Sequence, residues 1–406
     1  MTSSSSSSAR RRPWLALVAA VVAAAGCARD RAGPTPAAAW SPNLARARVA
    51  MLPLNNLTGQ TVSLQPVQES LELALRARHL DVTAGDAVRR AMAAHRIRNT
   101  RGVDAAAAKA LREDLGVDAV LVTSVLLLDP VFPPKLAVEM RLVSTGDPPR
   151  LLWADGKATG GMDSPGLLGL GILPSLTDVQ FEVVNELAGS LAAYLDHGAL
   201  PDPGCAVIRP RVAAGARRVD EPPPWGVAML PFVNQTSRRD ASEAVSAELV
   251  RQLVATGLFR VVEPGLVRAE MLSRRIVIDG GASLDTANAI GSIVGAPILL
   301  TGYVRDYADL PGRSAPPRVE FSVYAIEGAT GRVLWWSGSR AGGEDGVIFF
   351  GLGRVTTAAG LACGAARGIA EKLLASTERP ADDRTGIDAT SAQPRREGAS
   401  DAPDPR

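Results

Sequence analysis

Val49-Ala-Met-Leu-Pro-Leu-Asn-Asn-Leu-Thr58 is repeated with few changes 178 residues later, as Val227-Ala-Met-Leu-Pro-Phe-Val-Asn-Gln-Thr236. Three more pairs of segments follow in the same order: Gly116 and Gly295 with the apolar runs after them, Leu151-Leu-Trp153 and Val333-Leu-Trp335, and Gly169-Leu-Gly171 and Gly351-Leu-Gly353. Four ordered matches at a nearly constant offset indicate a tandem duplication of one domain. The two predicted copies span residues 47–197 and 225–376.

Both copies show the same order of predicted elements. Each opens with a short apolar run that Pro and Asn end (48–54 and 226–233), which predicts a strand covered on both faces. An amphipathic helix follows, with apolar residues at i, i+4 and i+8: Val67, Leu71 and Leu75 in the first copy, and Val245, Leu249 and Leu253 in the second. Gly116 and Gly295 stand where a left-handed residue ends a helix.

The remaining elements follow from similar signals. In the first copy they are a short strand (80–83), two helices (the second at 105–115), three strands (119–127, 136–143 and 151–157) and a closing helix (178–195). In the second copy the same elements are a short strand (259–262), two helices (the second at 286–294), three strands (298–306, 319–326 and 333–339) and a closing helix (356–374). The predicted fold class is α/β, with a mixed sheet and the order β-α-β-α-α-β-β-β-α in each copy.

The segments outside the two copies have compositions of their own. Arg10 to Arg12, an apolar run from Trp14 to Ala25 and Gly26-Cys27 predict a signal peptide over 1–26. This run is too short to span a membrane as a helix. Residues 27–46 are interpreted as a tether, 198–224 as a Pro-rich linker and 377–406 as a disordered tail.

Composition excludes several classes of function. The 406 residues carry a net charge of +2 and only 4% aromatic side chains, which disfavours a nucleic-acid partner. Three cysteines cannot form a disulfide framework. Cys205 and Cys363 could pair in an oxidising compartment, but the place of Cys363 on the last helix favours a small core residue.

Motifs that carry chemistry are absent from the sequence. Neither a phosphate-binding glycine motif nor a metalloprotease or serine-hydrolase motif occurs. Three histidines, two of them near predicted helix ends, and no clustered cysteines leave no plausible zinc ligand set. We therefore expect no enzymatic activity, no metal and no cofactor.

Two kinds of residue are candidates for binding a partner. Asn56 and Asn234 lie at the carboxyl end of the first strand of each copy, where ligands of open α/β sheets tend to bind, although a turn or helix cap is the favoured explanation. Two Gly-rich apolar stretches precede the last helices and contain Leu167, Leu170, Phe349 and Phe350. Each stretch is either an exposed loop that docks a partner or a neighbouring copy, or a loop folded across the sheet.

A known periplasmic domain resembles this sequence in three features. They are the opening segments of the copies, Gly-Leu-Phe-Arg-Val-Val-Glu at 257–263, and Gly-Ala-Pro-Ile-Leu-Leu-Thr-Gly at 295–302. This domain is shared by CsgG-type curli-export lipoproteins, the amino-terminal domain of TolB and LpoB-type activators of peptidoglycan synthases. Ala24-Ala-Gly-Cys27 similarly resembles a bacterial lipobox, which implies lipidation of Cys27. Ala28, rather than Asp, after the cysteine implies outer-membrane sorting.

These resemblances imply a non-enzymatic binding or assembly factor, anchored by lipid in the outer membrane and facing the periplasm. Its expected partner is an envelope protein in export, surface assembly or peptidoglycan-synthase regulation, and homo-oligomers are possible. The alternative is a subunit of a CsgG-like oligomeric export channel. Because neither copy contains a spare amphipathic hairpin of 9–11 residues per strand, the sequence disfavours that alternative.

Overall fold

The computed structural model describes residues 42–163, 171–202, 204–215, 223–278, 284–312, 315–348 and 353–378. All of them belong to one compact unit of the chain. The predicted signal peptide, Cys27 and the predicted tail from residue 379 onward lie outside the described residues. In the described part of the chain, no helix is long and apolar enough to cross a membrane.

The first repeat contains a mixed sheet in the strand order β3-β1-β4-β5-β6, and the short β2 pairs with β4. The strands β1 to β4 pair in parallel, and β4, β5 and β6 pair antiparallel. Its elements are η1 (Pro42–Arg46), β1 (Val49–Met51), β2 (Asn55–Asn56), α2 (Gln65–Arg76), β3 (Val82–Thr83), α3 (Asp86–Ala94), α4 (Ala105–Leu115), β4 (Ala119–Asp129), β5 (Lys135–Ser144), β6 (Leu151–Gly160) and α5 (Leu176–His197).

The second repeat contains an equivalent sheet in the order β10-β8-β11-β12-β13-β7, with β9 paired to β11. Its elements are β7 (Val212–Ala214), β8 (Trp225–Met229), β9 (Val233–Asn234), α6 (Ala241–Ala255), β10 (Phe259–Val261), α7 (Pro264–Ser273), α8 (Leu284–Val294), β11 (Ile298–Ala308), β12 (Arg318–Glu327), β13 (Val333–Gly342) and α9 (Ala358–Glu378). The predicted fold class and its duplication are confirmed.

Local signals in the sequence explain where the helices begin and end. The Asp104 carboxylate accepts the Ala107 N–H at the start of α4, and Gly116 ends that helix with φ of 64°. Ser175 and Asp178 form a reciprocal capping box at the start of α5. Gly295 has φ of 63°, which matches Gly116 in the second repeat.

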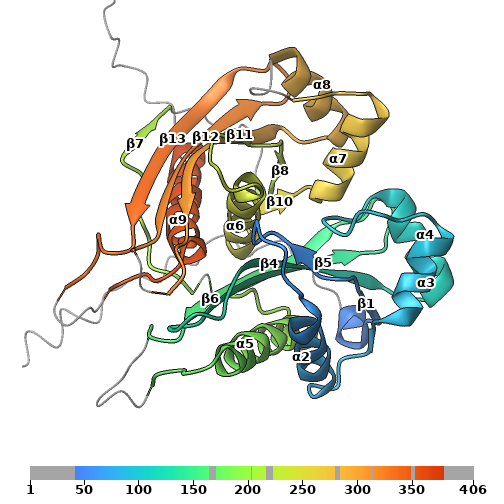
Figure 1. Cartoon of the computed structure of the whole chain (residues 1–406). Helices are drawn as coiled ribbons and strands as arrows, with labels where there is room; N and C mark the ends of the chain where they lie inside the picture. The colour runs from blue at the N-terminus through green and yellow to red at the C-terminus, as the bar shows by residue number, and fades with distance from the viewer. Residues whose placement is uncertain are drawn as a thin grey trace, which may run out of the picture. The chain divides into compact units, whose positions relative to one another are not determined.

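The two repeats stack as alternating layers within this unit (Figure 1). Helices α2 and α5 pack on one face of the first sheet, and helices α3 and α4 cover part of its other face. Helices α6 and α9 pack on the second sheet, in a core that also includes Leu126, Ala137 and Ala154 of the first sheet. The order of layers is therefore α2/α5, first sheet, α6/α9, second sheet.

Residues 204–215, which we call the strap, do more than connect the repeats. Cys205 forms a disulfide with Cys363 of α9, with 6.2 Å between the Cα atoms. The expectation of an unpaired core cysteine is therefore corrected, because Cys363 is buried but its sulfur is bonded to that of Cys205. The strap then crosses α9, where the Ile208 N–H donates to the Gly364 carbonyl at 2.9 Å, and ends as β7 on the edge of β13.

Candidate functional site

Most of the residues proposed from the sequence for partner binding lie outside the described part of the chain. These residues are Leu167, Leu170, Phe349 and Phe350, together with the lipidation site Cys27. The residues that flank the two Gly-rich stretches are described, and they form equivalent backbone hydrogen bonds in the two repeats. The Leu173 N–H donates to the Gly161 carbonyl at 2.9 Å, and the Val355 N–H donates to the Gly343 carbonyl at 3.0 Å.

Residues that flank the two stretches also lie next to each other. The Thr356 hydroxyl, at the end of the second stretch, donates to the carboxylate of Asp163 at the start of the first. Asp163 also accepts the Gly160 N–H at 2.7 Å. Burial raises the pKa of Asp163 above its ordinary value, and these hydrogen bonds oppose that effect. The fold therefore brings the start of the first stretch next to the end of the second.

Asn56 and Asn234 form the same turn in both repeats. The Asn56 side-chain oxygen accepts the Thr58 N–H at 3.0 Å, and the Asn234 oxygen accepts the Thr236 N–H at 3.0 Å. Helix α2 begins only at Gln65, so Asn56 is a turn residue and does not cap the helix. In this structure both asparagines use their polar atoms within the loop, and the turn explanation accounts for them.

The outer face of β11, β12 and β13 is the most distinctive exposed surface. Val319, Phe321, Val323 and Ala325 of β12 point into the core shared with α6 and α9, so the alternate residues point the other way. We call this surface the open face. Its residues are Tyr303, Arg305, Asp306, Arg318, Glu320, Tyr324, Trp336, Gly338 and Arg340, and Ser322 between them is buried.

Aromatic and charged side chains meet on the open face. The rings of Tyr303 and Tyr324 are in edge contact, with 6.1 Å between their centroids. The Trp336 side chain is 37% exposed. Glu320 lies 3.9 Å from Arg305 and 3.6 Å from Arg340, so one carboxylate is shared by two guanidinium groups. A hollow of about 340 Å³ lies beside these charges, lined in part by Arg211 of the strap.

The equivalent face of the first sheet is covered by α6. Strand register pairs Glu139 with Gly156 in the first repeat and Ser322 with Gly338 in the second. A Cβ atom added at Gly156 would lie 3.1 Å from Nε of Arg251, which belongs to α6. Among the described residues, nothing lies within 4 Å of a Cβ atom added at Gly338. The same position is therefore covered in one repeat and open in the other.

Ionisable groups are buried where α6 covers the first sheet. Arg251 donates to Glu248 at 3.0 Å through Nε, and its Nη1 lies 4.0 Å from the Asp155 carboxylate. Nε of Arg141 lies 3.3 Å from Glu139, an ion-pair distance without hydrogen-bond geometry. Burial raises the pKa of Glu139 to about 7, although Arg141 opposes the shift. Burial also raises the pKa of Glu248 and Asp155.

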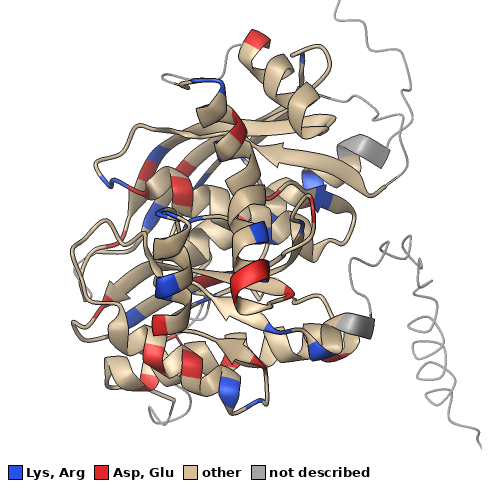
Figure 2. Ribbon diagram, turned by 90° about the vertical axis from the view of Figure 1, so that its right-hand side faces the viewer, with Lys and Arg blue, Asp and Glu red and all other residues tan. Residues whose placement is uncertain are grey.

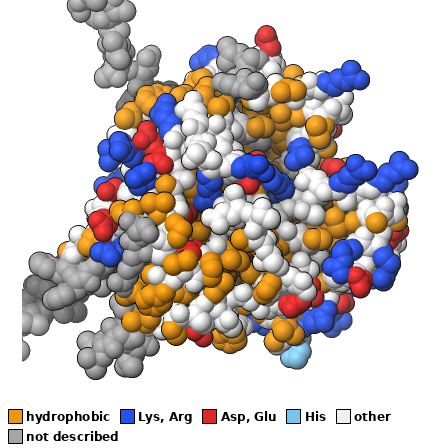
Figure 3. All heavy atoms as spheres, viewed as in Figure 1, with side chains coloured by type: hydrophobic (Ala, Val, Ile, Leu, Met, Phe, Trp, Pro, Cys, Tyr) orange, Lys and Arg blue, Asp and Glu red, His pale blue; other side chains and the backbone are white. Residues whose placement is uncertain are grey.

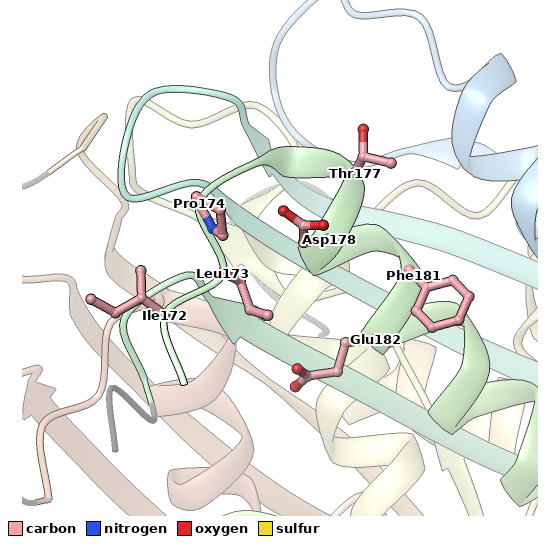
Figure 4. A pocket seen from close by; sticks show the side chains of 7 residues that line it. All are labelled: Ile172, Leu173, Pro174, Thr177, Asp178, Phe181 and Glu182. Carbon is pink, nitrogen blue, oxygen red and sulfur yellow. The ribbon is translucent and has the colours of Figure 1, made fainter. Parts of the chain in front are cut away.

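A second exposed surface lies on the outermost helical layer. Ile172, Leu173 and Pro174 lead into α5 and line a hollow of about 720 Å³ with Phe181 and Glu182 of that helix (Figure 4). The Phe181 ring is 70% exposed. Figure 3 shows hydrophobic side chains gathered over the lower part of the molecule, where Figure 1 places α5 and β6.

Sequence reasoning missed the open face, although a signal was present. In β5 the outward positions include Ala137, and in β6 they are Ala154, Gly156 and Ala158. The equivalent positions of β12 and β13 are Glu320, Trp336, Gly338 and Arg340. Small side chains on one copy, and large aromatic or charged ones on the other, indicate that the two faces have different surroundings.

In the described part of the chain, no group of three or more possible metal ligands occurs.

No family model matches the chain, and no curated protein matches it. Among solved structures, it is similar to a PelC dodecamer from Paraburkholderia phytofirmans, with 16% identity, a TM-score of 0.29, and coverage of 42% of this chain and 96% of that one. It is also similar to lipoprotein GNA1162 from Neisseria meningitidis, with 15% identity, a TM-score of 0.25, and coverage of 30% of this chain and 85% of that one. A third similar structure is the LpoB carboxy-terminal domain from Salmonella enterica, with 16% identity, a TM-score of 0.24, and coverage of 30% of this chain and 87% of that one. These likenesses are distant.

Proposed function

We propose that this protein is a lipoprotein anchored in the outer membrane on its periplasmic side, where it is a non-enzymatic binding or assembly factor of an envelope system. The open face is the observation that carries the binding role. Tyr, Trp and Arg are enriched in protein interfaces; Tyr324 and Trp336 are paired across β12 and β13, and Arg340 lies further along β13 on the same face. A protein partner is therefore the occupant that this chemistry favours.

The proposed location rests on the sequence before the first repeat. A basic segment, an apolar segment and Gly26-Cys27 are the features that support cleavage before Cys27 and its lipidation. More than one acyl chain anchors a protein stably, whereas a single chain binds reversibly. Residues 28–41 separate that anchor from the first described residue.

Replacement of the lipidated cysteine tests the location. Cys27→Ala should leave the protein unlipidated, so that it fractionates with the soluble periplasmic proteins instead of the outer membrane. Ala28→Asp is the matched control, because it keeps the cysteine and should move the lipidated protein to the inner membrane. If Cys27→Ala still fractionates with the outer membrane, the proposed anchor is wrong.

A photo-reactive residue on the open face tests the binding role. With p-benzoylphenylalanine in place of Trp336, irradiation of intact cells should join the protein covalently to a partner that contacts this face. The control position is Lys109, whose exposed side chain lies on α4. If Trp336 and Lys109 give the same background of products, the open face does not bind a protein and the binding role is overturned.

A further inference from the structure

Connections of the two repeats are bonded to each other at one end of the sheets. The Asp129 carboxylate, at the end of β4, accepts the N–H of Gly312, which follows β11, at 3.0 Å. Nζ of Lys135, the first residue of β5, donates to the Leu310 carbonyl at 3.1 Å. Both charged side chains are buried. The β4–β5 turn and the start of the β11–β12 loop therefore form one surface with a fixed geometry.

Two further connections lie at the same end. The Gly161 N–H, after β6, donates to the Pro134 carbonyl at 2.7 Å, and the Gly343 N–H, after β13, donates to the Pro317 carbonyl at 2.9 Å. In Figure 1, β6 and β13 both end on the left of the molecule. The tip is the name that we give to the described residues 130–134, 309–312 and 344–348 at this end. It contains residues of both repeats.

The tip exposes large apolar side chains. Val131, Phe132, Leu310 and Ile348 are each at least 42% exposed. The β4–β5 turn, Pro-Val-Phe-Pro-Pro (130–134), contains no charged residue. Single exposed apolar residues are normal on a protein surface, but several from separate loops at one end form a common apolar surface.

The opposite end of the sheets, where β4 and β13 begin, is charged. Arg48 and Asp118 form an ion pair there at 3.4 Å, and both side chains are about half exposed. The turn between β12 and β13 carries Glu327 and Arg332. Figure 2 faces this side of the molecule and shows segments of both charge signs. The two ends therefore favour different surroundings, water at the charged end and an apolar medium at the tip.

The composition of the tip favours a lipid surface over a protein as its occupant. Protein interfaces are enriched in Tyr, Trp and Arg, which is the composition of the open face. The exposed residues of the tip are instead Val, Phe, Leu and Ile, with Pro between them. Apolar side chains on separate loops need no complementary pocket in a bilayer, where an apolar surface sinks about 5–10 Å into the boundary between headgroups and acyl chains.

The segment before the first repeat is long enough for the tip to reach a membrane. The Arg48 carbonyl accepts the Asp118 N–H, so the chain enters the first sheet at the charged end. Strand β4 has 11 residues and therefore spans about 36 Å from that end to the tip. Residues 28–41 span up to about 50 Å when they are extended. A lipid on Cys27 thus leaves the tip free to contact the same bilayer.

We propose that the tip inserts into the periplasmic leaflet of the outer membrane, with Phe132, Leu310 and Ile348 at the boundary between headgroups and acyl chains. This proposal rests on the proposed location for its membrane, but it concerns other residues than the anchor. It also fixes how the molecule stands. The long strands run toward the bilayer, and the open face is directed sideways into the periplasm, where a protein can reach it.

Fluorescence quenching in vesicles tests this contact with the lipidated full chain. Cys205 and Cys363 are bonded to each other and Cys27 carries the proposed lipid, so Phe132→Cys offers one thiol for an environment-sensitive fluorophore. The vesicles contain phosphatidylethanolamine, phosphatidylglycerol and a lipid with a nitroxide on its acyl chain. The fluorophore should be quenched several-fold more than the same fluorophore at Val333→Cys. That control residue is also apolar and 52% exposed, but it begins β13 at the charged end.

Charged substitutions at the tip give a second measurement, with the fluorophore at Ile348→Cys. Phe132→Asp and Leu310→Asp each place a carboxylate in the lipid boundary, so each should lower the ratio of inserted to free tip about tenfold or more. Their combination should reduce quenching to the level found at Val333. Val333→Asp is the matched control and should leave quenching at Ile348 unchanged. Because all three positions are exposed, thermal unfolding should show a fold as stable as that of the unsubstituted chain.

The tip and the anchor fail in different ways. Flotation with the vesicles reports any membrane contact, and the mass of the amino-terminal peptide reports lipidation. If the lipidated protein floats but Phe132 and Val333 are quenched equally, the tip does not insert and the anchor stands. If the protein is not lipidated, yet floats with Phe132 quenched more strongly, the anchor is wrong and the tip contact stands. A photo-reactive residue at Phe132 that captures one specific protein in intact cells also overturns the lipid contact.

Discussion

Glu139 is a fully buried carboxyl group on β5 whose titration affects stability. Its pKa is raised by burial from 4.5 to about 7, so the folded protein keeps a proton that the unfolded chain releases between these values. The free energy of unfolding should therefore fall as pH rises through this range. Glu139→Gln should flatten this fall and raise the free energy of unfolding at about pH 8 by up to ~3 kcal/mol.

Urea unfolding of the wild type and the variant at several pH values measures this effect. Part of the slope should remain in Glu139→Gln, because burial also raises the pKa of Glu248 and Asp155. Glu320→Gln is the control, since Glu320 is partly exposed on the open face. An unchanged slope in Glu139→Gln, equal to that of the control, would contradict the titration described for Glu139.

Single residues also show how far sequence reasoning reaches. Asn56 and Asn234 end the short strands β2 and β9 rather than the first strand of each copy, and their turns follow from the ability of Asn to bond nearby backbone groups. The burial of Glu139 and Arg141 was not predictable in the same way. Charged residues that alternate with apolar ones are typical of a strand with one solvent-exposed face, and only α6 makes that face interior.

At the scale of an element, the strap depends on the small residues of α9. Cβ atoms added at Gly364 and Gly368 would collide with the carbonyl oxygens of Ala206 and Ile208. Gly368→Val should therefore displace the strap and lower the free energy of unfolding by about 1–3 kcal/mol. Thermal unfolding measures this loss, and partial proteolysis within the strap should become faster.

Gly189 of α5 offers a matched control for this substitution. A Cβ atom there would meet the nearest Arg78 nitrogens at an ordinary 3.5 Å, and no strap crosses that helix. Gly189→Ala should be neutral or stabilise the protein by up to about 1 kcal/mol, because Ala favours a helix over Gly. Equal destabilisation by both substitutions would show that the loss in free energy of unfolding comes from replacing a glycine inside a helix, and not from displacing the strap.

The elements themselves were largely predictable, since each depends on local signals such as capping residues, a terminal Gly or apolar spacing. Residues 198–224 are the instructive exception. Their Pro-rich composition is typical of a linker, yet Val212–Ala214 extends the second sheet as β7. That strand is held by a distant disulfide and a neighbouring sheet edge, and neither contact leaves a local pattern in the sequence.

At the scale of the whole molecule, the duplication predicted two similar domains but not how they meet. Internal sequence similarity identifies equivalent elements, whereas docking depends on which equivalent surfaces have diverged. Gly156 and Gly338 occupy equivalent places on β6 and β13, and only the structure shows that Arg251 of α6 covers the first, whereas none of the described residues lies within 4 Å of a Cβ atom added at the second. The candidate site follows from that difference, which is why the sequence alone did not predict it.

The Cys205–Cys363 disulfide closes a ring of the chain that includes most of the second repeat. A protease that cuts once anywhere between these two residues opens the ring without releasing a fragment. On a denaturing gel the nicked protein would migrate as one covalent species until a reductant separates the pieces. In a compartment rich in proteases, the proposed lipid anchor at the amino terminus and the end of the last helix would thus remain covalently joined after such damage.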